Sequence, residues 1–448
     1  MKSNSVSPAR LAAFEILLRV EEGAYASVLL ASKQKELKTV DRALCHELVM
    51  GVLRQQLWLD RLAEHYANRK VAELDVAVRV VLRLGLYQLR FLTRVPASAA
   101  VNESVNLVFF ARLRSAGALV NAVLRRAARE PEVDPSSSII DPLERVAVAT
   151  SHPLWLIERW TRALGADEAQ AFAAANNEAA PLAFRVVNSR ARAAEVCERL
   201  RQSGAELVPS KVVKDAWRIS GAGSLLAELA AQGMVYQQDE ASQLVAEALG
   251  VQAGQRVLDL CAAPGSKTTH IADQSLNSGP ISPMVVASDL YEHRLRTVVS
   301  LAKLHQLTNI HCLALDGLQP LPVAENAFDR VLVDAPCSGT GTLRRNPEIR
   351  WRISPADILD LSQRQKQLLF NAARVVKPGG RLIYSTCSVE PDENEGVVQT
   401  FLENNETFRL GQLPLHRSLI TGSGAARTWP QRDDTDGFFI CALERKSE

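Results

Sequence analysis

The chain has 448 residues, of which 47% are hydrophobic and 23% are charged, so we expect two or three globular domains and neither a fibre nor a disordered polymer. No apolar run is long enough to cross a bilayer, and Glu15 interrupts the stretch that a signal peptide would need, so a cytoplasmic protein without a membrane partner is expected. The seven cysteines include no CxxC pair, and no group of His, Cys and Asp has the spacing of metal ligands, which predicts free thiols and no metal site.

The first part of the chain, from Ser7 to about Glu130, has the apolar spacing of amphipathic helices almost throughout. Ser7 followed by Pro8 is typical of a helix start, and Gly23 is typical of a helix end. This part is therefore predicted to be an all-helical domain.

Positive charge is concentrated in this helical part, which has 20 Lys and Arg against 11 Asp and Glu up to Arg129, whereas the remainder has 32 against 39. Four arginines recur at near-helical spacing around the candidate helix from Val76 to Leu92, and these are Arg79, Arg83, Arg90 and Arg94. Such a stripe is suited to a phosphate backbone, but it is equally typical of the solvent-facing side of a helical bundle. Both interpretations stay open on these residues alone.

The middle of the chain mixes short strands and helices, with Pro181–Val187 predicted as a strand and Ala191–Gln202 as a helix. After about Gly233, short apolar runs alternate with helical segments, which is typical of a mostly parallel sheet with helices on both faces. The runs are Arg256–Leu260, Met284–Ser288, Ile310–Leu315, Phe328–Val333 and Gly380–Ser385, with Gly437–Leu443 as a further, antiparallel edge strand.

Polar residues follow the apolar runs at the sheet edge where α/β proteins bind ligands. The first run leads into DLCAAPGSKT (259–268), a tight turn into a helix whose free backbone N–H groups, with Lys267, are suited to a ligand carboxylate. Asp289 ends the second run, where a carboxylate can accept both hydroxyls of a ribose, and Asp316 ends the third, near the expected position of an adenine edge. A single Asp of this kind is usually a turn or cap residue, but three at successive strand ends are more specific.

Two cysteines stand at the ends of the next two runs. Cys337 lies in DAPCSGTG (334–341) and Cys387 in STCS (385–388). One free cysteine is normally a small buried hydrophobic residue, but two on neighbouring strand ends indicate thiol chemistry. A basic and aromatic segment follows the first motif and is suited to RNA, with Arg344 and Arg345 as its first candidates for phosphate contact.

Methylation of cytosine at carbon 5 has two separate steps in which a thiol can take part. Carbon 5 of cytosine is a poor nucleophile until a thiolate adds to carbon 6, and a carboxylic group near N3 assists that addition. After transfer of a methyl group, the proton on carbon 5 must leave and the thiolate must be expelled. Spacing alone leaves open which cysteine attacks, and in DNA enzymes the attacking cysteine is that of the proline-cysteine motif, which here would be Cys337.

With DLCAAPGSKT, DAPCSGTG and STCS in this order, residues from about Gln237 onward resemble the RNA cytosine-5 methyltransferases of the Nop2/Sun (Fmu) family. The resemblance implies that Cys387 attacks carbon 6, that Cys337 promotes elimination and that Asp334 supports the ring. It also implies that S-adenosyl-L-methionine is the cofactor, held by Asp289, Asp316, Asp334 and the loop residues Cys261, Ala262, Ala263, Pro264, Gly265, Ser266 and Lys267.

The helical part is similar to the NusB-like RNA-binding domain of the family's bacterial small-subunit rRNA member, for instance in Asp41–Arg54. The implied fold is multidomain, with an all-α NusB-like domain at 1–135, a small α+β domain at 145–235, and an α/β Rossmann-like, seven-stranded methyltransferase domain at 236–448. The implied substrate is 16S rRNA, free or in an assembling small subunit, and the protein is expected to act as a monomer. A tRNA cytosine-5 methyltransferase and a non-catalytic assembly factor that binds RNA are the alternatives.

The sequence departs from the family at one position of the cofactor loop. The family usually has Gly-Gly-Lys where this chain has Gly265, Ser266 and Lys267. If the second position required a left-handed backbone, a serine there would cost about 1–2 kcal/mol of local strain. Reduced cofactor affinity is the consequence expected in that case.

Overall fold

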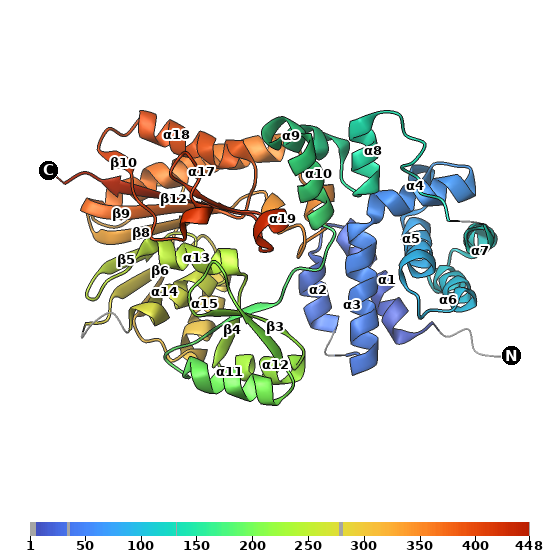
Figure 1. Cartoon of the computed structure of the whole chain (residues 1–448), viewed down its shortest axis with the longest axis horizontal. Helices are drawn as coiled ribbons and strands as arrows, with labels where there is room; N and C mark the ends of the chain where they lie inside the picture. Colours follow the sequence, from blue (N-terminus) through green and yellow to red (C-terminus); the bar gives the residue numbers. More distant parts are fainter. Residues whose placement is uncertain (1–5, 34–35, 131, 277–280, 448) are drawn as a thin grey trace. The chain divides into compact units, whose positions relative to one another are not determined.

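The computed structural model describes residues 6–33, 36–130, 132–276 and 281–447 (Figure 1). By their contacts these residues form two compact units. The first, here called the helical unit, comprises Met1–Ala179 together with Leu343–Arg352. The second, here called the sheet unit, comprises Ala180–Thr342 and Ile353–Glu448. Within the described residues, no helix combines the length and the apolar character needed to cross a membrane.

The helical unit contains short and medium helices joined by brief turns. They are α1 (Pro8–Glu21), α2 (Ala26–Lys33), α3 (Thr39–Arg54), α4 (Gln56–Ala67), η1 (Val71–Glu73), α5 (Val76–Phe91), α6 (Ala97–Phe110), η2 (Arg114–Ala116), α7 (Gly117–Arg129), α8 (Pro142–Ala149), α9 (Leu154–Leu164), α10 (Ala166–Ala175) and α16 (Ile349–Arg352). The predicted helix start is confirmed, since α1 begins at Pro8 directly after Ser7.

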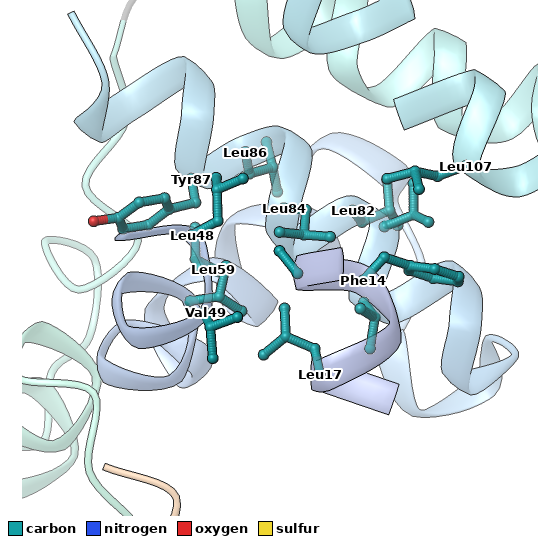
Figure 2. Packing of buried hydrophobic residues seen from close by; sticks show 14 of the residues in the cluster. Phe14, Leu17, Leu48, Val49, Leu59, Leu82, Leu84, Leu86, Tyr87 and Leu107 are labelled. Carbon is teal, nitrogen blue, oxygen red and sulfur yellow. The ribbon is translucent and has the colours of Figure 1, made fainter. Parts of the chain in front are cut away.

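Helix α5 is the central element of this unit. Helices α1, α3, α4, α6 and α7 all pack against it, so residues on every side of α5 are buried. Figure 2 shows Leu82, Leu84 and Leu86 of α5 among apolar side chains of the surrounding helices, including Phe14 of α1 and Leu107 of α6. A helix surrounded in this way has little room for a solvent-facing stripe.

The sheet unit begins with a small antiparallel sheet covered by two helices. Its elements are β1 (Ala183–Val186), α11 (Ala193–Gln202), β2 (Glu206–Pro209), β3 (Ala216–Ser220), α12 (Gly223–Ala231) and β4 (Val235–Gln237), with strand order β2-β3-β1-β4. The strand and the helix predicted here are confirmed. The expected middle domain at 145–235 is divided by contacts, however, because α9 packs with α8 and α10 in the helical unit while the strands belong to the sheet unit.

The main sheet of this unit has eight strands. They are β5 (Arg256–Asp259), β6 (Met284–Asp289), β7 (Ile310–Ala314), β8 (Phe328–Asp334), β9 (Val376–Thr386), β10 (Phe408–Leu410), β11 (Ala426–Thr428) and β12 (Phe438–Arg445). The helices of the same region are α13 (Glu240–Leu249), α14 (Ser266–Ser275), α15 (Glu292–Leu304), η3 (Thr340–Thr342), α17 (Pro355–Val375), η4 (Pro391–Glu393), α18 (Glu395–Glu403), η5 (Arg417–Leu419) and α19 (Pro430–Asp433).

The strand order is β10-β12-β9-β8-β5-β6-β7, with β11 also paired to β12. The five predicted parallel runs are confirmed as β5 to β9, and β12 is antiparallel to β9 as predicted. The expectation that β12 forms the edge of the sheet is wrong, because β10 pairs with its other side. Seven strands were expected, and the eighth arises because β10 and β11 pair with different parts of β12. The chain order reverses on either side of β5, and the crevice beyond the carboxyl ends of strands at such a point is where α/β proteins bind ligands.

Candidate active site

A cavity of about 430 Å³ lies beyond the carboxyl ends of the central strands. Its wall combines three aspartates with three cysteines, namely Asp289, Asp316, Asp334, Cys261, Cys337 and Cys387. Of the predicted cofactor loop, Cys261 and Ala263 line the cavity, whereas Ala262, Pro264, Gly265, Ser266 and Lys267 are outside its lining. The structure thus brings together Cys337, Cys387 and the strand-end aspartates Asp289, Asp316 and Asp334, whereas Asp259, at the end of β5, is outside the lining of the cavity.

The loop after β5 turns at Gly265, whose φ of 107° lies in the left-handed region. Ser266 is the first residue of α14 and does not have a positive φ. The strain considered for Ser266 is therefore absent, because the left-handed position is the preceding glycine. A Cβ at Gly265 would lie 3.1 Å from Cα of Val298, so this turn also packs tightly against α15.

Asp289 and Asp316 are held by backbone amides at their strand ends. Asp289, at 5% exposure, accepts hydrogen bonds from the N–H groups of Ala263 (3.3 Å) and Tyr291 (3.2 Å), and Arg294 Nη1 lies 3.3 Å from it. Asp316 accepts the N–H of Leu318 at 2.9 Å. These contacts fix both carboxylates as acceptors toward the cavity.

Asp334, at the end of β8, shares an ion pair with Lys267. Lys267 Nζ donates to Oδ2 at 2.7 Å, and Ser385 Oγ donates to Oδ1 at 2.8 Å. Burial lowers the pKa of Lys267, but the charge of Asp334 outweighs it, so the pKa is raised and the lysine stays charged. The partner of Lys267 in this structure is therefore a carboxylate of the protein itself.

The two cysteine sulfurs lie 3.3 Å apart. Strands β8 and β9 are parallel neighbours, with Asp334 opposite Ser385, so the residues that follow them meet at one edge of the sheet. The hydrogen bond with Cys387, together with burial, raises the pKa of the Cys337 thiol well above its usual value. Cys337 therefore holds its proton firmly and can share it with the Cys387 sulfur.

A third cysteine and a buried aspartate lie beside this pair. Burial, followed by the charge of Asp259, raises the pKa of Cys261 well above its usual value, so Cys261 remains a neutral thiol. Burial also raises the pKa of Asp259 to about 7, although Thr268 Oγ1 donates to Oδ2 at 2.7 Å.

Glu393 is a buried carboxylate that was not predicted as a site residue from the sequence. It contacts Ser338 and Ser388, which directly follow Cys337 and Cys387.

The arginines proposed for RNA contact do not form one exposed stripe. Arg83 is 5% exposed and pairs with Asp60 (2.7 Å) and Glu21 (2.6 Å). Arg83 is buried because α5 is surrounded by other helices, and acidic residues of these helices compensate its positive charge. Arg94 is exposed but follows the end of α5.

The remaining four positions differ in exposure. Arg79 is half-buried beside Glu21, and Arg90 donates to Tyr66 Oη at 2.9 Å. Arg345 is half-buried, whereas Arg344 is buried at 2% exposure and donates to the carbonyl of Ala179 at 2.9 Å. Arg344 therefore stabilises the helical unit through a buried contact.

Three family models match the sequence. They describe the NusB family at residues 7–129, a ferredoxin-like domain of RsmF/B-like methyltransferases at 152–226, and the 16S rRNA methyltransferase RsmB/F at 246–444. A probable ribosomal RNA small subunit methyltransferase B of Bacillus subtilis is 34% identical over 458 residues and is matched over 100% of both chains. The chain belongs to the RsmB/F 16S rRNA methyltransferase family.

Solved structures agree with this membership of the RsmB/F family. The crystal structure of PH0851 matches with a TM-score of 0.84 and 28% identity over 98% of this chain and 99% of the other. A methyltransferase homolog protein from Pyrococcus horikoshii matches with a TM-score of 0.59 and 28% identity over 68% of this chain and 100% of its own. This member of the RsmB/F family is thus an S-adenosylmethionine-dependent methyltransferase with a NusB-like helical domain and a ferredoxin-like domain.

The cavity fits S-adenosylmethionine by its chemistry. Its aspartates are acceptors, which suit the ribose hydroxyls and the amino groups of the cofactor, and its other wall is apolar, with Leu290, Leu315 and Leu318 available for a flat ring. We propose that Asp289 holds the ribose and that Asp316 contacts the adenine edge.

Proposed function

We propose that this enzyme transfers a methyl group from S-adenosylmethionine to carbon 5 of a specific cytosine in 16S rRNA, through a covalent bond between Cys387 and carbon 6. The observation that carries the proposal is the pair of sulfurs 3.3 Å apart in the wall of the cavity that also holds the strand-end aspartates. A binding module has no need of two thiols at that place. With an rRNA substrate, the reaction belongs in the cytoplasm, and a monomer contains every residue that it requires.

The first step is addition of the Cys387 thiolate to carbon 6 of the base. The electrons of the C5–C6 double bond move through the ring toward N3, which takes the proton that Lys267 Nζ otherwise shares with Oδ2 of Asp334. These two groups are 2.7 Å apart, and the ammonium of Lys267 compensates the charge that Asp334 carries. The ring is then an enamine with a nucleophilic carbon 5.

S-adenosylmethionine, when bound, supplies an electrophilic methyl group for carbon 5. Cys337, after it has lost its own proton to solvent, then takes the proton from carbon 5 as a thiolate while the bond between carbon 6 and Cys387 breaks. N3 returns its proton to the Asp334–Lys267 pair, and Cys337 passes the proton it has taken to solvent. The raised pKa of Cys337 makes its thiolate a strong base for this step.

RNA contacts are proposed for the arginines that are exposed or half-buried, which are Arg79, Arg90, Arg94 and Arg345. The NusB match and the net positive charge up to Arg129 support an RNA role for the helical unit. Free 16S rRNA and an assembling small subunit are both substrates to be compared.

The substrate is tested by transfer of tritium from labelled S-adenosylmethionine to 16S rRNA, to tRNA and to assembling small subunits, with bisulfite sequencing of the product. We expect one modified cytosine in 16S rRNA. Label in tRNA alone would identify the tRNA enzyme instead, and RNA binding without any label would identify the assembly factor.

The roles of the cysteines are tested by two substitutions. Cys387→Ala is expected to abolish both methylation and the covalent adduct, because no thiolate reaches carbon 6. Cys337→Ala is expected to trap a protein–RNA complex that survives denaturing electrophoresis, because the proton on carbon 5 is not removed. The opposite pair of results would make Cys337 the attacking residue.

A further inference from the structure

Glu393 is a buried carboxylate at the end of η4, and its side chain has no exposure to solvent. It lies outside the three motifs that identify the active site. A buried charge of this kind is costly unless hydrogen bonds compensate it, so its partners indicate what it is for.

The partners of Glu393 come from both cysteine loops and from α17. Its Oε1 accepts the backbone N–H of Ser338 and the side-chain amide of Gln365, each at 2.9 Å. Its Oε2 lies 2.5 Å from the hydroxyl oxygens of Ser338 and Ser388. Ser338 directly follows Cys337, and Ser388 directly follows Cys387, so one carboxylate holds the residue after each cysteine.

Neighbouring contacts fix the other side of each cysteine. Gln365 Nε2 also donates to the carbonyl of Pro336 at 2.8 Å, directly before Cys337. Asn394, which follows Glu393, accepts from Thr386 Oγ1 at 2.6 Å and donates to the carbonyl of Ser388 at 2.8 Å, on the two sides of Cys387. Both flanks of Cys387 and the residue after Cys337 are thus tied to Glu393 and Asn394, and the residue before Cys337 is tied to Gln365, which itself donates to Glu393.

We infer that Glu393 is a positioning residue, which holds the loops of Cys337 and Cys387 together so that the two sulfurs face the base at hydrogen-bonding distance. It does not touch the substrate and acts through Ser338 and Ser388. The role in catalysis rests on the proposed function, whereas the role in pairing the thiols does not.

Glutamine can replace this glutamate with its contacts kept. Its carbonyl oxygen can take the place of Oε1, where the two N–H donors are obligatory, and its amide nitrogen can face the two hydroxyls, which rotate to accept. Alanine removes every contact, and aspartate keeps the charge but is one methylene too short to reach both loops.

The experiment compares Glu393→Gln, Glu393→Ala and Glu393→Asp in the full-length chain. Phenylarsine oxide, which bridges two thiols only when they are close, measures the pairing without RNA or cofactor, and Cys387→Ala supplies the background. Methyl transfer to 16S rRNA is measured on the same preparations. Glu395→Gln is the matched control, since Glu395 lies two residues on and pairs with Arg427 at 2.6 Å, away from the cysteines.

We expect Glu393→Ala and Glu393→Asp to lose phenylarsine oxide capture and to lower kcat about 100-fold, with KM for RNA changed little, because displacement of a reacting group by about 1 Å has an effect of that size. Glu393→Gln and the control should keep both properties. Glu393→Gln should also shift the pH profile of product release to lower pH, since the charge of Glu393 contributes to the raised pKa of Cys337.

Retained capture in Glu393→Asp would overturn the inference, and this variant decides the question if Glu393→Ala does not fold. Lost capture in Glu393→Gln would overturn it as well, because the charge and not the positioning would then be required. Normal capture in the wild type without any methyl transfer to RNA would instead contradict the proposed function and leave the thiol pairing supported.

Discussion

Cys337 works as a base only in its thiolate form, and in the free enzyme the hydrogen bond with Cys387 and burial raise its pKa. In the covalent adduct Cys387 is a thioether, so burial remains as the cause that keeps the pKa of Cys337 raised. Below that pKa, the thiolate fraction grows about tenfold for each pH unit, so release of the covalent adduct should become faster as the pH rises. Quenched single-turnover reactions from about pH 6.5 to about pH 8.5 would follow the adduct on denaturing gels. A lifetime independent of pH would assign the base to another group.

Asp289 presents a carboxylate that backbone amides and Arg294 already orient. Asp289→Ala removes the acceptor proposed for the ribose hydroxyls, and we expect about 10- to 100-fold weaker S-adenosylmethionine binding by calorimetry, since a hydrogen bond to a charged group contributes about 1.5–3 kcal/mol. RNA binding should be unchanged. Unaltered cofactor affinity would show that the ribose lies elsewhere.

Among single residues, the sequence predicted the positions of those that directly follow parallel strands. Residues after parallel strands meet at one edge, so the aspartates and cysteines could be placed together from the order of the runs alone. The surroundings of Arg83 and Glu393 depend on partners from other segments, such as Asp60 and Ser388, and no local pattern reveals them. Arg83 therefore fits the spacing of the predicted stripe although its side chain is buried.

Three backbone segments meet at Gly341, the last residue of the Cys337 motif, which lies in η3. Its N–H donates to the carbonyl of Cys387 at 3.0 Å, and its own carbonyl accepts from Gly437 at 2.8 Å. A Cβ at Gly341 would lie 1.9 Å from the Gly437 oxygen. Gly341→Ala should therefore lower the free energy of unfolding by about 1–3 kcal/mol and impair activity.

Urea unfolding and single-turnover methylation would measure both effects of this change. Gly422→Ala is the matched control, because nothing lies within 4 Å of a Cβ there and the backbone is not left-handed. Equal behaviour of the two variants would mean that η3 can move without loss of the site.

The long elements were predictable because apolar runs of five or six residues with helices between them have few other solutions. The strands β10 and β11 were missed because each has only three residues, and their pairing depends on the length of β12. The division of the middle region at Ala179 was not predictable either, because it depends on contacts between helices that are far apart in the sequence, such as α8 and α4.

By their contacts, residues 343–352 belong to the helical unit although they follow much of the sheet unit in the sequence. Arg350 of this segment is fully buried and donates to the carbonyl of Ser151 (3.1 Å), the side chain of Asn177 (2.8 Å) and the carbonyl of Asn176 (3.2 Å). Trp351 Nε1 donates to the carbonyl of Leu53 at 3.1 Å.

Arg350→Met would leave the acceptors of Arg350 unsatisfied, and we expect the helical unit to lose about 2–4 kcal/mol of stability. Scanning calorimetry of the full chain should show a lower transition temperature for that unit. Arg374→Met serves as the control, since Arg374 is 61% exposed and pairs only at the surface with Glu325. An unchanged transition would mean that the segment contributes nothing to the unit.

The inclusion of residues 343–352 in the helical unit has a consequence for synthesis on the ribosome. Domains usually fold in order from the N-terminus at a translation rate of about 5–20 residues per second. Here residues 180–342 must be made before the last part of the helical unit exists, a delay of roughly 10–30 s. We therefore expect the RNA-binding helices to complete their packing only after the Cys337 loop has left the ribosome, so that a prematurely terminated chain holds neither an intact helical unit nor an active site.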